Sequence, residues 1–249
     1  MIDHLKILLH QGKQYIPDVT KAIISDTFRG RPVISNLQVD EQQLIDLCPT
    51  GAISNMPFSI DLGKCIFCGQ CAFACPEKIK FSNDYKMATN DRNGLIIKEG
   101  EDQPILIHAD LIRKEISTYF KGSLKLRQVC AGGDNSCELE LNAASNVNFD
   151  MSRFGIEFVA SPRHADGIVI TGPVTKNMAA SLKLCYEAIP EPKIIILAGT
   201  DAISGGMFTY SDAINRSFLD LYPIDLYIPG NPVHPLSFIN GLLELIRKR

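Results

Sequence analysis

The chain has 249 residues, of which 45% are hydrophobic and 21% charged, a balance typical of a globular protein with one or two domains. Its formal net charge of −3 argues against nucleic-acid binding, and no apolar stretch approaches the roughly 20 residues that a membrane-spanning helix needs. The first residues lack the apolar region of a signal peptide, so we expect a cytoplasmic protein with reduced cysteines, at most peripheral on the cytoplasmic face of a membrane complex.

A dense run of cysteines follows a short predicted helix that extends from about Asp3 to Gln11. Residues 65–76 read Cys-Ile-Phe-Cys-Gly-Gln-Cys-Ala-Phe-Ala-Cys-Pro, which is the C-x2-C-x2-C-x3-C-P spacing of iron–sulfur proteins. Zinc sites usually pair two C-x2-C hooks that lie far apart in the sequence. The spacing therefore favours an iron–sulfur cluster over a zinc site or a set of buried free thiols.

A degenerate copy of this run precedes it and ends at Cys48-Pro49. Counting back from Cys48, the other three ligand positions hold Gln38, Glu41 and Leu44, none of which is a usual cluster ligand. In two-cluster ferredoxins the fourth cysteine of each run binds the cluster of the other run. The first run has thus kept only the cysteine that the second cluster needs, which predicts a single 4Fe-4S cluster.

The predicted ligands of this cluster are Cys48 and the first three cysteines of the complete run, Cys65, Cys68 and Cys71. Cys75 is then left without a cluster. The alternative is that Cys75 replaces Cys48 as the fourth ligand of the same cluster.

A polar stretch at residues 84–104 marks the predicted boundary between an iron–sulfur domain, residues 1–98, and a second domain, residues 99–249. In the second domain, β-branched runs typical of buried strands alternate with helical segments, which indicates βαβ units and a parallel sheet. The predicted strands are Leu124–Val129, Gly155–Ala160, Gly167–Thr171 and Lys193–Gly199, and the predicted helices are Ala109–Tyr119, Glu138–Asn146, Lys176–Ala188 and Pro235–Lys248.

Loops rich in glycine, proline and polar residues connect these elements. Sites in parallel sheets form beyond the carboxyl ends of the strands. We therefore expect the loops to converge on one edge of the sheet; they comprise residues 130–138, 161–166, 171–175, 199–208 and 228–235.

Motifs in both halves support a family resemblance. Those of the second half are Arg153-Phe-Gly-Ile, Ser161-Pro-Arg-His-Ala-Asp, Thr171-Gly-Pro-Val-Thr, Ser204-Gly-Gly and Tyr227-Ile-Pro-Gly. In order and spacing they resemble the small subunit of membrane-bound nickel–iron hydrogenases of the formate hydrogenlyase type, a homologue of the 20-kDa subunit of respiratory complex I.

The first half is similar to the ferredoxin-like subunit of the same complexes, the 23-kDa subunit of complex I. Its motifs are Phe28-Arg-Gly-Arg-Pro, Cys48-Pro-Thr-Gly-Ala-Ile and Leu62-Gly-Lys-Cys-Ile-Phe-Cys-Gly-Gln-Cys. The resemblance implies a fusion of two electron-transfer subunits. It also implies an α+β ferredoxin-like domain followed by an α/β flavodoxin-like domain.

The resemblance further implies a second, proximal 4Fe-4S cluster, whose cysteine positions correspond here to Asp134, Cys137, Asp201 and Asn231. Only Cys137 keeps a thiol, and iron–sulfur clusters require soft thiolate ligands. We therefore predict that this cluster is lost. The replacements could instead hold a hard cation through their oxygen atoms, bind a small molecule in the vacated pocket, or be solvated loop residues.

Partners and their contact residues are also implied by the resemblance. A hydrogenase-like or complex-I-like large subunit and other redox subunits are the expected partners. Arg163 and His164 would lie at the edge that faces the partner or a quinone, although a histidine in such a loop is more often only hydrogen-bonded. No catalytic triad, paired carboxylates or metal-hydrolase motif is present, so we expect no catalytic centre in this chain.

Three functions are compatible with these patterns. The chain could be a one-cluster electron-transfer subunit of an oxidoreductase assembly. It could be a non-catalytic adaptor that docks a hydrogenase-type large subunit, because the loss of the proximal cluster interrupts the usual relay. It could also bind a small molecule in the vacated cluster pocket.

Overall fold

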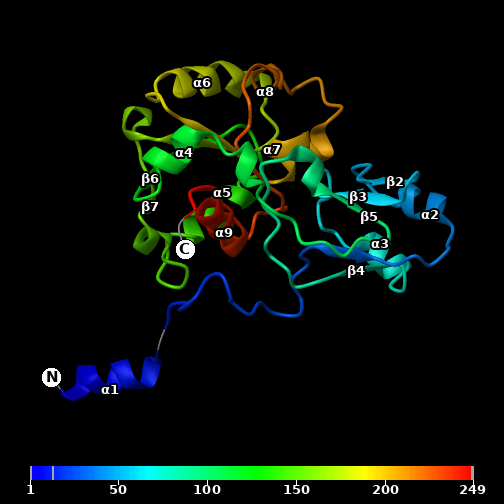
Figure 1. Ribbon diagram of the computed structural model, residues 1–249, viewed down its shortest axis with the longest axis horizontal. Helices are drawn as coiled ribbons and strands as arrows, with labels where there is room; N and C mark the ends of the chain where they lie inside the picture. The colour runs from blue at the N-terminus through cyan, green and yellow to red at the C-terminus, as the bar shows by residue number, and fades with distance from the viewer. Residues whose placement is uncertain (1, 13, 248–249) are drawn as a thin grey trace.

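A five-stranded parallel sheet forms the centre of the second half in the computed structural model, which describes residues 2–12 and 14–247 (Figure 1). The strand order is β10-β9-β8-β6-β7, with every neighbouring pair parallel. The α/β prediction is confirmed, and so are the four predicted strands; β10 was not predicted. Their bounds are β6 Leu124–Cys130, β7 Ile156–Phe158, β8 Gly167–Thr171, β9 Ile194–Ala198 and β10 Leu226–Ile228.

Helices cover both faces of this sheet, as Figure 1 shows. Alternate residues of a strand point to opposite faces, so Ile168 and Ile170 pack with α6 and α8, whereas Val169 packs with α5 and α9. A strand that is buried on both faces needs a continuous apolar run, which is why these strands were visible in the sequence. The helices are α4 Lys114–Tyr119, α5 Ser136–Ala143, α6 Lys176–Glu187, α8 Ser217–Leu221 and α9 Pro235–Leu245.

Three predicted helices differ from the structure in their extent. The helix predicted at residues 138–146 is α5, Ser136–Ala143. Residues 109–119 form a 3-10 turn (Ala109–Leu111) followed by α4, because Arg113 adopts an extended backbone between them. The Arg113 guanidinium makes two hydrogen bonds to Asp225, at 2.8 and 2.9 Å, which holds the chain in this break. The carboxyl-terminal helix ends at Leu245, and Lys248 lies outside the described residues.

The first half contains two small antiparallel sheets, which were not predicted. One pairs β1 with β4 and the other has the order β2-β3-β5. Helix α2 precedes Cys48, and α3 contains Cys71. The predicted first helix is confirmed as α1, which lies apart from the rest of the chain with none of its residues buried (Figure 1). The bounds are α1 Ile2–Gln11, β1 Pro32–Ile34, α2 Glu41–Asp46, β2 Ile53–Ser54, β3 Ser59–Asp61, α3 Gln70–Ala74, β4 Ile79–Phe81 and β5 Ile96–Lys98.

The two halves share one hydrophobic cluster. Ile34 and Ile60 of the first half belong to the same group of contacting buried side chains as Ile170, Leu182 and Phe218 of the second half. The cluster continues through helix α7 (Thr200–Ser204), which follows β9. Within the described ranges, no helix has the length and apolar character needed to cross a membrane.

Candidate metal centre

Four cysteines line a single cavity in the first half. Cys48 follows α2, Cys65 and Cys68 lie in the loop between β3 and α3, and Cys71 is part of α3. The cavity has a volume of about 20 Å³, and the rest of its lining is mostly apolar. Cys75, the residue that ends α3, is not part of the lining. The structure thus brings together the four cysteines that the sequence predicted as ligands.

Backbone N–H groups point at two of these sulfur atoms. The N–H of Ala52 donates to Cys48 Sγ at 3.2 Å, and that of Phe67 donates to Cys65 Sγ at 3.3 Å. The loop turns through positive φ angles at Phe67 (54°) and Gly69 (79°). The angle is easy for glycine but costs a side-chain-bearing residue about 1–2 kcal/mol, and Arg29 Nε helps to hold it by donating to Phe67 O at 2.6 Å. Such N–H donors stabilise the negative sulfur atoms of a bound cluster.

Burial favours the protonated form of two thiols of this cavity, Cys65 and Cys71. It raises the pKa of Cys65 to about 12 and that of Cys71 to about 11, and negative charge on neighbouring cysteines raises both further. Binding of a positively charged iron–sulfur core would displace these protons. Four thiols in an apolar cavity with N–H donors therefore fit a 4Fe-4S cluster.

A single zinc ion needs several donor atoms close together around one point. In the part of the chain that the structure describes, no three His, Cys, Asp or Glu side chains are close enough together to hold one ion. In a 4Fe-4S cubane each thiolate binds a different iron, so the sulfur atoms lie farther apart than the ligands of one zinc ion.

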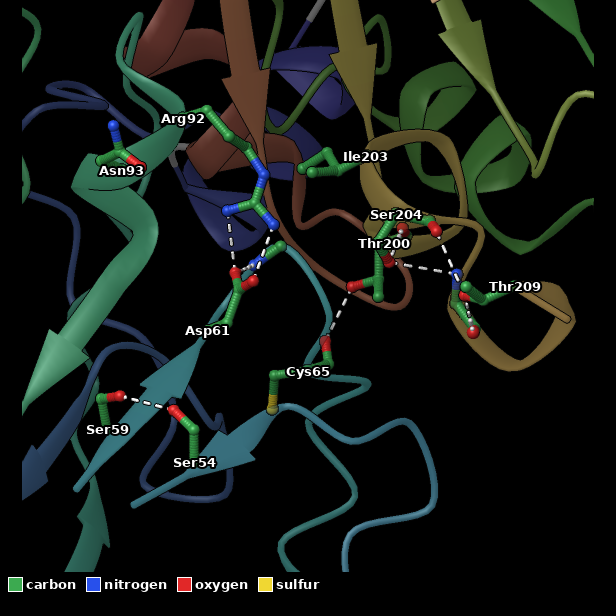
Figure 2. Close-up of polar contacts among 12 residues, drawn as sticks. Ser54, Ser59, Asp61, Cys65, Arg92, Asn93, Thr200, Ile203, Ser204 and Thr209 are labelled. Atoms are coloured by element: carbon green, nitrogen blue, oxygen red, sulfur yellow. Dashed lines mark hydrogen bonds and ion pairs between the residues drawn. The ribbon is translucent and has the colours of Figure 1, made fainter. Parts of the chain in front are cut away.

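A buried junction connects the cysteine loop to the second half, as Figure 2 shows. Thr200 Oγ1, at the start of α7, donates to Cys65 O at 2.7 Å and lies 3.2 Å from Gly230 O. Close by, the Arg92 guanidinium makes two hydrogen bonds to the Asp61 carboxylate, at 2.8 and 2.7 Å. Thr200 directly precedes Asp201, one of the four positions that correspond to the cysteines of the lost proximal cluster. This junction therefore places the cysteine cavity beside the proximal-cluster positions.

We expect Thr200→Val to lower the free energy of unfolding by about 1–3 kcal/mol, because it leaves the Cys65 carbonyl without its donor in a buried place. Chemical denaturation of the two proteins measures the difference. Thr209→Val is the matched control, since that hydroxyl lies at the exposed end of the same segment and also donates to backbone carbonyls. Equal losses in both variants would contradict a special role for Thr200.

Three of the four proximal-cluster positions, Asp134, Cys137 and Asp201, lie together at the carboxyl ends of β6 and β9. Cys137 is in the first turn of α5, 9% exposed, and is acted on by the charges of Asp134, Asp201 and Glu138. Burial is the main cause that raises the Cys137 pKa to about 12. Burial, together with the charge of Asp134, also raises the pKa of Asp201. This is a neutral thiol among carboxyl groups, a poor environment for a cluster.

Asn231, the fourth proximal-cluster position, lies at a different cavity. It lines a cavity of about 250 Å³ between the halves, together with Arg29, Phe67 and two titratable residues, Glu140 and His234. Burial lowers the pKa of His234 and raises that of Glu140, so both tend towards their neutral forms.

Arg163 and His164 lie at the opposite edge of the sheet, so the expectation that their loop converges with the others is wrong. Both belong to a 3-10 turn, Pro162–His164, that leads into Asp166. The N–H of Asp166 donates to Lys125 O at 2.7 Å, near the start of β6, and its carbonyl accepts from Ile194 N, at the start of β9. β7 has only three residues and ends level with the start of β8, which keeps this loop at the amino ends.

Sequence reasoning missed two residues of these sites. Glu138 directly follows Cys137 in the motif and accepts a short hydrogen bond from Thr171 Oγ1, so its place in the motif was a usable signal. Thr200 had no such signal, because its partners Cys65 and Gly230 are distant in the sequence.

The raised pKa of Cys137 predicts a pH-dependent stability. The folded protein holds this proton up to about pH 12, whereas the ordinary value is 9.0, so the stabilisation is complete below pH 9 and is lost as the pH rises towards 12. Between pH 8 and 10, wild type should lose about 1 kcal/mol more than Cys137→Ala. Denaturation of metal-free, reduced protein measures this, with Cys75→Ala, a cysteine of the other half, as control. Equal pH slopes for wild type and Cys137→Ala would contradict the assignment.

Comparison with known proteins matches each half to a different family. Residues 134–245 match the model of "NADH ubiquinone oxidoreductase, 20 Kd subunit", and residues 58–80 match a "4Fe-4S binding domain". A probable membrane-bound hydrogenase subunit, mbhJ, from Pyrococcus furiosus is 38% identical over 120 residues, which are 48% of this chain and 72% of that protein. The motif resemblance is thereby confirmed.

A second relative is the NADH-quinone oxidoreductase B-type subunit from Citrifermentans bemidjiense, which is 46% identical over 110 residues. These residues are 44% of this chain and 64% of the relative, so the chain spans just under two thirds of that protein. One chain in a solved structure of the membrane-bound sulfane sulfur reductase, described as an archaeal respiratory membrane complex, is 28% identical with a TM-score of 0.45. That match covers 51% of this chain and 70% of the other.

Proposed function

The chain belongs to the family of the 20 kDa subunit of NADH ubiquinone oxidoreductase and carries a 4Fe-4S binding domain, and on this premise we propose that it is an iron–sulfur electron-transfer subunit of a hydrogenase-like or complex-I-like oxidoreductase assembly. We place the boundary between its ferredoxin-like domain and its α/β domain after residue 98. The proposed location is cytoplasmic, peripheral to a membrane complex.

The observation that carries the proposal is the convergence of Cys48, Cys65, Cys68 and Cys71 on one cavity that excludes Cys75. These four residues would hold the 4Fe-4S cluster, which supplies one-electron transfer when bound. The N–H groups of Ala52 and Phe67 would stabilise the charge on two of the sulfur atoms. The apolar lining limits access of water to the site.

The α/β half is proposed to hold no second cluster. Asp134, Asp201 and Asn231 offer only oxygen and amide groups, and the one remaining thiol, Cys137, is buried and protonated. The proposed partner surface is the carboxyl edge of the sheet beside Asp201, where the segment after α7 exposes large apolar side chains. A hydrogenase-like or complex-I-like large subunit is the proposed partner.

A second candidate function is a non-catalytic adaptor, and the acidic surroundings of Cys137 favour it, since they interrupt the usual relay between clusters. A redox titration of the cluster-loaded protein distinguishes the two. A reversible one-electron signal at a potential accessible to cellular carriers supports electron transfer. A cluster that cannot be reduced without being destroyed supports the adaptor.

Small-molecule binding is a third candidate, favoured by the 250 Å³ cavity that Asn231 lines with Arg29 and His234. The position of this cavity beside Phe67 would place a bound molecule next to the cysteine loop. A ligand retained through purification and identified by mass spectrometry would support this function over the adaptor.

A further inference from the structure

The side chain of Lys78 is fully buried, which is rare for a lysine. Its Nζ atom donates to Leu37 O at 2.8 Å and lies 3.1 Å from the Glu99 carboxylate. It lies 4.0 Å from the Glu41 carboxylate and 4.9 Å from the centroid of the Phe58 ring. A buried charge is tolerated only where partners of this kind surround it, so the ammonium has a defined place in the fold.

The Lys78 ammonium lies beside the first cysteine run, which has lost three of its four ligand positions. Glu41 occupies one of the three lost ligand positions, and Leu37 directly precedes another, Gln38. Lys78 itself follows Cys75, the thiol left without a cluster, by three residues. Lys78 therefore connects the same two segments of chain that the thiolates of a first cluster would have connected.

Those two segments also carry ligands of the remaining site. Glu41 is the first residue of α2, and Cys48 follows that helix by two residues. Lys78 lies just beyond α3, which contains Cys71. A contact between Lys78 and the start of α2 therefore fixes the distance between the segment with Cys48 and the segment with Cys71.

We propose that Lys78 is a positioning residue for the metal centre. Its buried ammonium holds Cys48 within reach of the cluster, in place of the lost cluster of the first cysteine run. The inference rests on the proposed function, because it takes Cys48 as a ligand. Without the ammonium, the Leu37 carbonyl loses its donor and Glu99, whose side chain is 18% exposed, loses its cation. Both groups then favour water, and the segment that ends at Cys48 is released.

The test uses the full chain reconstituted with iron and sulfide in the absence of oxygen. Lys78→Met keeps the length of the side chain without the charge, and Lys78→Arg keeps the charge. Lys80→Met is the matched control, because Lys80 is an exposed lysine of β4, two residues along the chain. We expect about four irons per chain in wild type and Lys80→Met, less than half of that in Lys78→Met, and partial recovery in Lys78→Arg. Cys48→Ser combined with Lys78→Met should lose no more iron than Cys48→Ser alone.

General destabilisation is controlled with Leu242→Ala, a core substitution in α9 of the other half, compared by thermal unfolding. Full iron content in Lys78→Met would overturn the inference and leave the proposed function intact. Equal iron loss in Leu242→Ala, or a further loss in the double variant, would also overturn it. A wild-type protein that takes up no iron would overturn the proposed function and the inference together.

Discussion

Cys48→Ser is expected to remove most of the iron from protein reconstituted without oxygen, whereas Cys75→Ser is expected to leave about four irons per chain. The reason is geometric, because Cys48 lines the cavity with Cys65, Cys68 and Cys71, and Cys75 does not. Cys65→Ser should lose as much iron as Cys48→Ser. Iron and sulfide analysis, together with the visible absorption of the cluster, measures the effect.

Cys185→Ser is the control for this series, since that thiol lies in α6 of the other half. It should keep its iron. If Cys75→Ser empties the site while Cys48→Ser retains it, the ligand assignment is wrong and Cys75 is the fourth ligand. Loss of iron in every variant, Cys185→Ser included, would point to a general effect on folding.

Substitution of aromatic residues at the carboxyl edge of the sheet is expected to abolish partner binding. Phe208 is 46% exposed and Tyr210 is 98% exposed, both on the segment that follows α7. Exposed aromatic residues are common anchors of protein interfaces, and loss of such an anchor costs about 2–4 kcal/mol. The double variant Phe208→Asp, Tyr210→Asp should therefore weaken binding of a large subunit by at least about a hundredfold.

Affinity purification from the native host, followed by mass spectrometry, measures the recovery of that subunit. Leu184→Asp, Leu221→Asp is the matched control, because both leucines are 68% exposed on helices that cover a face of the sheet. Arg163→Glu tests the opposite edge separately. Recovery with the control but not with the aromatic variant supports docking at the carboxyl edge. Equal recovery with both rules that edge out.

The parallel sheet could be predicted from the sequence because its strands are buried on both faces. Gly167–Thr171 and Ile194–Ala198 are largely continuous apolar runs. Such short runs, rich in β-branched residues, are typical of strands in a parallel sheet. The strands of the first half have only two or three residues each, too few to establish an alternating pattern. The predicted helix at 109–119 was broken by Arg113, whose partner Asp225 is more than a hundred residues away in the sequence.

For the metal centre, the sequence predicted candidate ligands but not the contacts that support them. Spacing selected Cys48, Cys65, Cys68 and Cys71 as the predicted ligands, with Cys75 as the alternative to Cys48, because cluster ligands follow a strict local rule. The supporting contacts follow no such rule. Thr200 and Lys78 contact the site or its segments through partners that only the tertiary fold brings near. The opposite-edge position of Arg163 depended on the short length of β7, which the sequence did not reveal.

We expect the hydrophobic cluster that spans both halves to link the supply of iron to the lifetime of the whole chain. A shared core makes unfolding cooperative, so a first half that is weakened by missing metal also weakens the α/β half. Cells degrade chains according to the fraction that is unfolded. We expect the half-life of the chain, measured by pulse-chase labelling, to shorten in iron-limited cells, so that abundance of the protein follows the iron available to load it.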